Sequence, residues 1–312
     1  MRVAAVLLAL ALAAATAGAQ AALPDWAAAG RTVTIPVREA SGDVAQMSTT
    51  WFLPPGPGPF PVVVFSHGRA SGAQARATLE LGVSRSQLRY WLGKGVAVVS
   101  PLRPGYGASA GGDVENSGTR HDAQGRCVGR SDYAKTADAA VRTVTATLDW
   151  LRAQPWADAG DVLLVGQSVG GLTTVAAGAL PLPGVVGYVN FAGGSGGNPA
   201  LSPGVSCEPA QIERLYARYG TTTHVPNLWI YAVNDQYWGP DRPVEWHAAF
   251  ARGGSASTFV HAAAVPDGDG HGLSRHAAAL WAPAVDAFVA RIGFPAKAAN
   301  AAVAGPAASA SR

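Results

Sequence analysis

The sequence predicts an α/β fold, in which a mostly parallel, twisted sheet of about eight strands carries helices on both faces. Short apolar runs with the length of buried parallel strands, such as residues 62–66 and 162–165, alternate with longer segments of helical character. The second of these runs ends in a Gly-x-Ser-x-Gly pattern at 166–170, which leads into a small-residue helix at 172–180. Strand, tight turn and helix therefore follow one another directly.

The other elements follow from the same patterns along the chain. Residues 32–38 and 46–53 alternate in polarity around a turn at 40–43, so they predict an opening hairpin. The proline-rich segment 54–61 cannot continue a strand. Further strands are expected at residues 62–66, 95–100, 162–165, 185–191, 227–233 and 257–265. Helices are expected at residues 78–92, 137–154, 172–180, 209–219 and 242–252.

The composition is that of a protein with a sizeable core. Of 312 residues, 48% are hydrophobic and 14% are charged, and the formal net charge is only +3. The basic residues are scattered, so nothing indicates nucleic acid or an anionic membrane as a partner. We expect one folded domain over residues 20–294 and a disordered, alanine-rich tail over 295–312. The sequence does not indicate an oligomeric state.

The N-terminus has the pattern of a secretory signal. A positive charge at Arg2 precedes an apolar core and the small-residue motif at 17–19. We expect residues 1–19 to be removed, with Ala21 as a second possible cut, and the mature protein to be secreted or periplasmic. A membrane anchor is the alternative, but an alanine-rich run of this length is marginal against the roughly 20 apolar residues that a span needs.

Two cysteines, Cys127 and Cys207, are the only thiols of the chain. An even count in an exported protein favours a disulfide over two separate buried thiols. The loops at 108–132 and 192–207 that carry these cysteines both follow parallel strands, so they leave the same edge of the sheet. A bridge between them would tie both loops together over the expected pocket.

Ser168 is the candidate nucleophile. It stands at the centre of the Gly-x-Ser-x-Gly turn, where Gly166 and Gly170 allow the backbone to approach closely while the serine adopts a strained conformation. The alternative is an ordinary serine in a glycine-rich turn. The position between a buried strand and a small-residue helix favours the nucleophile.

An oxyanion hole is expected beside Ser168. His67 and Gly68 end the strand at 62–66, so we assign the backbone N–H groups of Arg69 and Val169 as the two donors. The guanidinium of Arg69 can point into the pocket, where it would favour substrates with a carboxylate, or outward into solvent.

Asp235 and His271 are the expected acid and base. Asp235 follows the strand at 227–233, and His271 lies between two glycines after the last strand. Asp241 is the competing carboxylate, but it has the character of a helix N-cap. The other six histidines precede the acid or lie beside or inside elements: His67, His121, His224, His247, His261 and His276.

Four side chains near these loops are expected to contact the substrate: His67, Tyr106, Tyr237 and Trp238. The three aromatic residues Tyr106, Tyr237 and Trp238 would give the pocket aromatic walls.

A zinc site is an alternative use of the segment around His271, with four candidate ligands: Asp267, Asp269, His271 and His276. Its glycine-rich spacing does not match known helical or cysteine-supported sites, so no metal is expected.

From about residue 62 to residue 294, the chain resembles the α/β-hydrolase superfamily and, within it, the dienelactone hydrolase-like serine hydrolases. The resemblance rests on motifs at residues 67–68, 103–107, 166–171, 234–235 and 270–272. It implies hydrolysis of esters or related acyl compounds without a cofactor, and the expected partner is a small-molecule ester substrate. The enzymes that name this branch use a cysteine where this chain has Ser168, which points away from dienelactone and toward a general carboxylesterase.

The expected activity is therefore ester cleavage through a Ser-His-Asp triad and an acyl-enzyme intermediate. Two alternatives stay open. A peptidase or amidase of the same fold would use the same machinery. A hydrolase-like binding protein would lack turnover, although none of the three catalytic side chains is missing here.

Overall fold

The computed structural model describes residues 29–70 and 72–295, so the expected signal segment and nearly all of the expected tail lie outside the described residues. Eight strands form the main sheet in the order β1-β2-β4-β3-β7-β8-β11-β12. Their bounds are Arg31–Arg38, Val44–Phe52, Ala97–Pro101, Phe60–Ser66, Ala157–Gln167, Val185–Phe191, Asn227–Ala232 and Ser257–Ala262 in that order. β2 is antiparallel to β1 and β4, and all other neighbours are parallel. The predicted fold class is confirmed.

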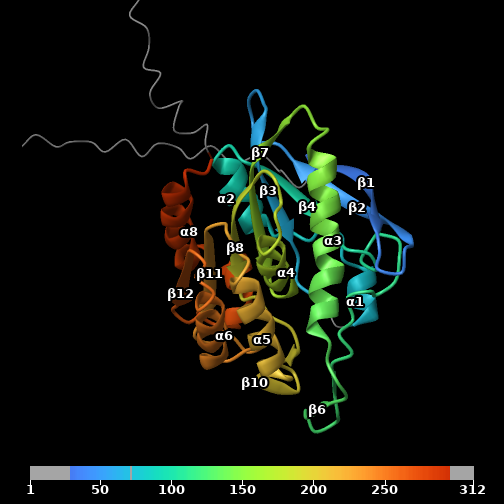
Figure 1. Cartoon of the computed structure of the whole chain (residues 1–312), viewed down its shortest axis with the longest axis vertical. Coiled ribbons are helices and arrows are strands. Elements are labelled where there is room, and N and C mark those ends of the chain that lie inside the picture. Colours follow the sequence, from blue (N-terminus) through green and yellow to red (C-terminus); the bar gives the residue numbers. More distant parts are fainter. Residues whose placement is uncertain (1–28, 71, 296–312) are drawn as a thin grey trace, which may run out of the picture.

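Helices cover both faces of this sheet (Figure 1). The helices α1 to α8 span Ala73–Ala77, Arg85–Gly93, Tyr133–Leu151, Val169–Gly178, Pro209–Gly220, Asp241–Ala251, Leu273–His276 and Ala278–Ile292. Apolar residues of α3, α4, α5 and α6 pack on one face, and those of α2 and α8 pack on the other. Because side chains alternate along a strand, Val62 and Val64 of β3 belong to the first core while Val63 and Phe65 belong to the second.

Some predicted boundaries differ from the structure. The helix expected over 78–92 begins only at Arg85, because the Ser84 hydroxyl accepts a hydrogen bond from the Gln87 N–H and caps the helix there. The C-terminal helix Ala278–Ile292 was not predicted, and Pro283 lies inside it. The loop expected over 192–207 contains a short antiparallel pair, β9 (Gly197–Asn198) and β10 (Ser202–Ser206).

The parallel strands bring three chain segments to one edge of the sheet. β3, β7 and β11 end at Ser66, Gln167 and Ala232, and their continuations carry the oxyanion candidate, the nucleophile candidate and the acid candidate. Because parallel strands place their carboxyl ends at the same edge, residues about 100 positions apart along the chain meet there. The fold therefore gathers the predicted site residues without any local sequence relation between them.

A disulfide between Cys127 and Cys207 fastens two loops at this edge, as predicted. Cys127 belongs to the small hairpin of β5 (Arg120–His121) and β6 (Cys127–Val128), which lies at the same end of the molecule as β10 (Figure 1). The Tyr133 hydroxyl donates a hydrogen bond of 2.6 Å to the carbonyl of Cys207, so helix α3 supports the bridge. The loops that surround the expected pocket are thus cross-linked.

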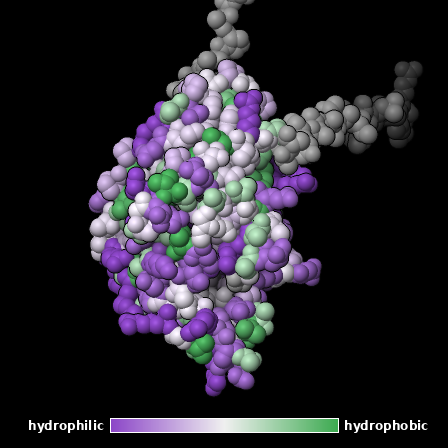
Figure 2. Space-filling view, turned by 90° about the vertical axis from the view of Figure 1, so that its right-hand side faces the viewer, coloured by the Kyte–Doolittle hydropathy of each residue, from purple (hydrophilic) through white to green (hydrophobic). Residues whose placement is uncertain are grey.

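Across residues 29–70 and 72–295, no helix combines the length and the apolar character that a membrane span requires. On the face shown in Figure 2, hydrophobic side chains are scattered among polar ones rather than gathered into one patch. Such scattered exposure is normal for a folded surface.

Removal of the disulfide should destabilise the protein. The two cysteines are 80 residues apart, and the loss of a loop constraint of this length costs on the order of 4 kcal/mol of unfolding free energy in the chain-entropy model. Urea denaturation of a Cys127→Ser/Cys207→Ser variant and of the unmodified protein measures the difference. A loss well below about 1 kcal/mol would contradict a stabilising role.

Candidate active site

Ser168 occupies a sharp turn between β7 and α4. Its backbone has φ 59° and ψ −124°, a conformation that L-residues rarely adopt. Close packing imposes this turn: a Cβ on Gly170 would lie 1.9 Å from the Ser66 carbonyl oxygen, and one on Gly166 would lie 2.0 Å from the Gly170 oxygen. The glycines are therefore required by space, and the serine takes the strained elbow conformation that the sequence pattern predicts.

Asp235 and His271 form a buried pair. Oδ2 of Asp235 lies 3.0 Å from Nδ1 of His271, while its Oδ1 accepts the backbone N–H groups of Tyr237 at 2.7 Å and Trp238 at 3.1 Å. Asp235 is 2% exposed. Because a carboxylate accepts hydrogen bonds, Nδ1 of the imidazole carries the proton, and Nε2 is left with its lone pair. Asp241, the competing acid, begins helix α6 and is exposed.

Neighbouring rings and backbone contacts hold the His271 imidazole. The ring of Tyr237 stacks on it with centroids 3.9 Å apart, and Trp238 meets it edge-on at 5.3 Å. Asp269 accepts the backbone N–H of His271 at 2.8 Å, so this carboxylate fixes the loop rather than the ring. Gln167, which precedes the nucleophile candidate, donates to the His271 carbonyl at 3.1 Å. This bond ties the histidine loop to the serine turn.

The Ser168 hydroxyl has no hydrogen-bond partner among residues 29–70 and 72–295. It is therefore not joined to His271 in this structure, although Gln167 links the two backbones. Catalytic hydrogen bonds are commonly long or poorly aligned without substrate and tighten in the complex.

Two backbone N–H groups next to Ser168 have no acceptor within the described part of the chain: those of Arg69 and Val169. Val169 opens helix α4, whose first N–H groups have no partner inside the helix. Gly68 lies against the elbow, because a Cβ there would be 3.2 Å from the Cβ of Ser168. These two N–H groups, which follow Gly68 and Ser168 in the chain, are the candidates to bind an anionic oxygen.

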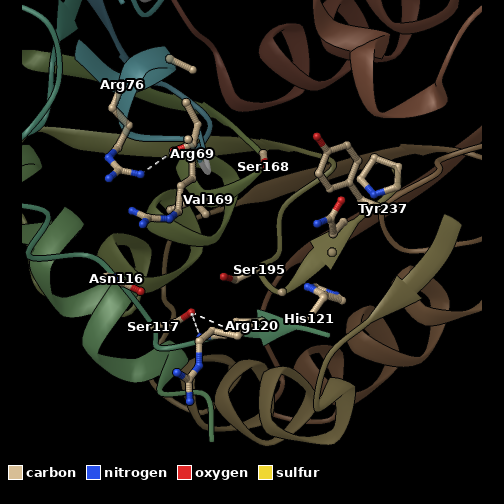
Figure 3. Close-up of a pocket in the computed structure, with 18 of the residues that line it drawn as sticks. Arg69, Arg76, Asn116, Ser117, Arg120, His121, Ser168, Val169, Ser195 and Tyr237 are labelled. Carbon is tan, nitrogen blue, oxygen red and sulfur yellow. Dashed lines mark hydrogen bonds between the residues drawn. The ribbon is translucent and has the colours of Figure 1, made fainter. Parts of the chain in front are cut away.

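A polar cleft of about 650 Å³ opens over this site. Ser168 and Val169 lie on one side of it, and Arg120 and His121 from the β5/β6 hairpin lie on the other (Figure 3). Most of its other lining residues are polar or glycine. Tyr237 and Trp238, two of the expected substrate contacts, line the cleft, and Arg69 does as well.

The other two expected substrate contacts do not line the cleft. The ring of His67 is 1% exposed, with Nδ1 2.7 Å from the Gly68 carbonyl and Nε2 accepting the Arg103 N–H at 3.1 Å. Tyr106 is fully buried and donates its hydroxyl hydrogen bond to Glu115. Both predictions are corrected, because a buried polar network draws these side chains away from the cavity.

Glu115 is the centre of that network, and sequence reasoning missed it. Its carboxylate pairs with Arg103, accepts the Tyr106 hydroxyl, and lies 3.1 Å from Nη1 of Arg69. Burial alone would raise the pKa of Glu115, but the charge and hydrogen bonds of Arg103 dominate and lower it to about 2. Glu115 is therefore a carboxylate at any pH at which the protein would work.

The guanidinium of Arg69 is already paired with two acidic side chains. It forms two hydrogen bonds of 2.6 Å with Asp113, one from each terminal nitrogen, besides its contact with Glu115. This bidentate pairing is the geometry that a substrate carboxylate would otherwise use. An anionic substrate would have to displace Asp113 to reach it.

Potential metal ligands come together at the disulfide-linked hairpin. Among the described residues, one group of three potential ligands comes together: His121, Cys127 and Cys207. Both cysteines are in the disulfide, so neither offers a thiolate. Asp267 and His276 of the alternative zinc set do not join His271 in such a group.

Comparison with protein-family models and with curated protein sequences finds no match. Solved structures do match. An esterase of Pyrococcus furiosus superposes with a TM-score of 0.53 at 12% identity, covering 84% of this chain and 90% of that one. A candidate dienelactone hydrolase of Klebsiella pneumoniae gives 0.52 at 14% identity, covering 85% and 99%. An acylaminoacyl peptidase of Pyrococcus horikoshii gives 0.54 at 15%, covering 85% of this chain but only 41% of the peptidase. At the level of the fold, the expected resemblance is confirmed.

Acid should destabilise the fold through His67. Burial, reinforced by the charge of Arg103, lowers the pKa of His67 from 6.5 to about 3. As pH falls from about 6.5 toward 3, His67 therefore binds a proton in the unfolded chain but not in the folded chain. The free energy of unfolding falls over that range. Between pH 7 and pH 5 the loss due to His67 is about 2 kcal/mol.

Urea denaturation at both pH values measures this loss, and a His67→Gln variant provides the comparison. The variant should lose less stability on acidification than the unmodified protein, because it has no imidazole to protonate. Equal losses in the two proteins would contradict the assignment of His67 as a buried neutral histidine.

Proposed function

We propose that this chain, which has the α/β-hydrolase fold, is a serine hydrolase that cleaves carboxylic esters through Ser168, His271 and Asp235. The observation that carries the proposal is the buried pair of Asp235 and His271, whose loop is tied by the Gln167 side chain to the turn that holds a serine in the strained elbow conformation. In such sites the imidazole takes the proton of the serine hydroxyl, and the carboxylate fixes the imidazole tautomer that can do so.

Acylation follows from this arrangement. Nε2 of His271 takes the Ser168 proton while Oγ forms a bond to the ester carbonyl carbon, and the carbonyl oxygen becomes an oxyanion. When the carbonyl forms again, the bond to the alkoxide breaks, and the proton on Nε2 passes to the leaving alcohol. Asp235 keeps its hydrogen bond to Nδ1 throughout and stabilises the imidazolium.

Deacylation repeats the sequence with water. His271 takes a proton from a water molecule, the resulting hydroxide adds to the acyl carbon, and the proton returns to Oγ as the carboxylic acid leaves. The N–H groups of Arg69 and Val169 receive the oxyanion in both halves, and the N-terminal end of helix α4 adds its positive dipole.

The polar, loop-walled cleft suits small esters that carry hydrogen-bonding groups. Its cross-linked hairpin, together with the sequence pattern at 1–19, supports an exported single-domain enzyme, since disulfides persist in oxidising compartments. Amide cleavage is the second candidate, because acylaminoacyl peptidases are among the structural neighbours. Matched p-nitrophenyl esters and p-nitroanilides distinguish the two activities.

Loss of the nucleophile should abolish turnover. A Ser168→Ala variant should lose at least about 10⁴-fold in kcat for p-nitrophenyl acetate while it keeps its fold, because nothing else in the site can attack the carbonyl. Ser195→Ala, which changes another buried serine of the same cleft, is the matched control and should keep its activity. Retained activity in Ser168→Ala would refute the proposal, and a non-catalytic binding protein would show no turnover at all.

Replacement of Asp235 should lower the activity through its effect on the His271 imidazole. An Asp235→Asn variant should lose on the order of 10³- to 10⁴-fold in kcat, because an amide can present its N–H to Nδ1 and so favour the wrong tautomer. Asp241→Asn is the control and should behave like the unmodified enzyme. Equal activity in all three proteins would show that Asp235 does not orient the base.

A further inference from the structure

We propose that Glu115 is a positioning residue for the oxyanion hole, a role that rests on the proposed function. It would hold the turn at residues 67–69 so that the N–H of Arg69 points to the place where the substrate oxygen becomes charged. Glu115 comes from the long loop before helix α3 and is 2% exposed, so it touches no substrate itself.

Glu115 acts on this turn through Arg103. The guanidinium of Arg103 pairs with Glu115 and donates to the carbonyl of His67 at 2.6 Å and to that of Gly68 at 3.3 Å. The backbone N–H of Arg103 donates to the His67 ring at 3.1 Å. The peptide group that contains the Arg69 N–H and the peptide group before it are thus held by a single buried cation.

Glu115 also acts on the turn from its other end. Nη1 of Arg69 lies 3.1 Å from Oε1 of Glu115, and Asp113 holds the same guanidinium with two further bonds. The residue that supplies the N–H is therefore anchored by its own side chain. Because Arg103 and Arg69 approach the same carboxylate, the turn is fixed both at its peptide carbonyls and at the side chain of the residue that supplies the N–H.

The loop that carries Glu115 is itself fixed. The Thr136 hydroxyl donates to the Glu115 carbonyl at 2.8 Å, which anchors the loop to helix α3. The Tyr106 hydroxyl donates to the carboxylate, and burial raises the pKa of Tyr106 to about 12, so it remains a neutral donor. The carboxylate is thus a rigid reference point for both arginines.

Stability alone is a weak reason for this arrangement. A buried ion pair repays the desolvation of its charges only with good geometry, and an apolar pair of equal volume is often as stable. The pair here has a specific geometric consequence, because its hydrogen bonds end on the carbonyls next to a catalytic donor. Such positioning matters most in the transition state, where the oxyanion is fully formed.

The test compares Glu115→Gln, Arg69→Gln and the unmodified enzyme. In both variants kcat for p-nitrophenyl acetate should fall about 10- to 100-fold, since a displacement of about 1 Å in a catalytic group has effects of this size. KM should stay within about threefold. The inhibition constant of an alkyl trifluoromethyl ketone, whose adduct with serine carries the oxyanion, should rise by the same factor as kcat/KM falls.

Asp286→Asn is the matched control. Asp286 accepts from Lys94 and from the Tyr90 hydroxyl, both at 2.7 Å, in a charged cluster that shares no residue with the cleft. Its kinetic constants and ketone affinity should not change. A purely structural role of Glu115 would instead lower the amount of folded enzyme while the constants per active site stayed the same.

Each outcome decides between alternatives. Unchanged kcat and ketone affinity in folded Glu115→Gln or Arg69→Gln, or a loss confined to KM, would overturn the positioning role. Glu115→Gln leaves the charge of Arg103 buried without its partner, which can prevent folding. Arg69→Gln then decides alone, because it keeps the pair of Arg103 and Glu115 intact. If the unmodified enzyme cleaves no ester or amide, the proposed function itself fails, which is a different result.

Discussion

The close approach of Gly170 to the carbonyl of Ser66 is the contact on which the site depends. It presses the start of helix α4 onto the end of strand β3, so the chain has to turn sharply between β7 and α4, and Ser168 is forced to a positive φ. The same contact brings the turn after β3 against the serine, as the position of Gly68 shows. One steric constraint therefore sets both the exposure of the hydroxyl and the place of the N–H groups beside it.

Two buried carboxylates then complete the site in different ways. Asp235 lies behind the imidazole and selects its tautomer, while Glu115 lies behind the turn at 67–69 and gathers two arginines around it. Each is removed from water, and each is compensated by hydrogen bonds from several donors. Low exposure strengthens such bonds and makes their loss costly, so they restrain both loops.

Chain order in the sequence was sufficient to propose Ser168, Asp235 and His271, and the structure brings Asp235 and His271 together. Ser168 lies in a recognisable turn, and Asp235 and His271 follow strands whose ends must share one edge. Glu115 could not be found in this way, since its segment has no periodicity and its partner Arg69 is 46 residues away in sequence. The assignments of His67 and Tyr106 to the cleft failed for the same reason, because tertiary partners decided where their side chains point. Helix α8 was not predicted. Helix α2 begins later than the predicted helix at 78–92, because Ser84 caps its N-terminus.

The central claim is that Ser168 is an activated nucleophile, and covalent labelling tests it most directly. After incubation with an alkyl fluorophosphonate, intact-mass measurement and peptide mapping should find one adduct per chain, on Ser168, and none when the protein is first unfolded in urea. Failure of the folded protein to react, or a reaction at another residue while Ser168 stays unmodified, would contradict the account.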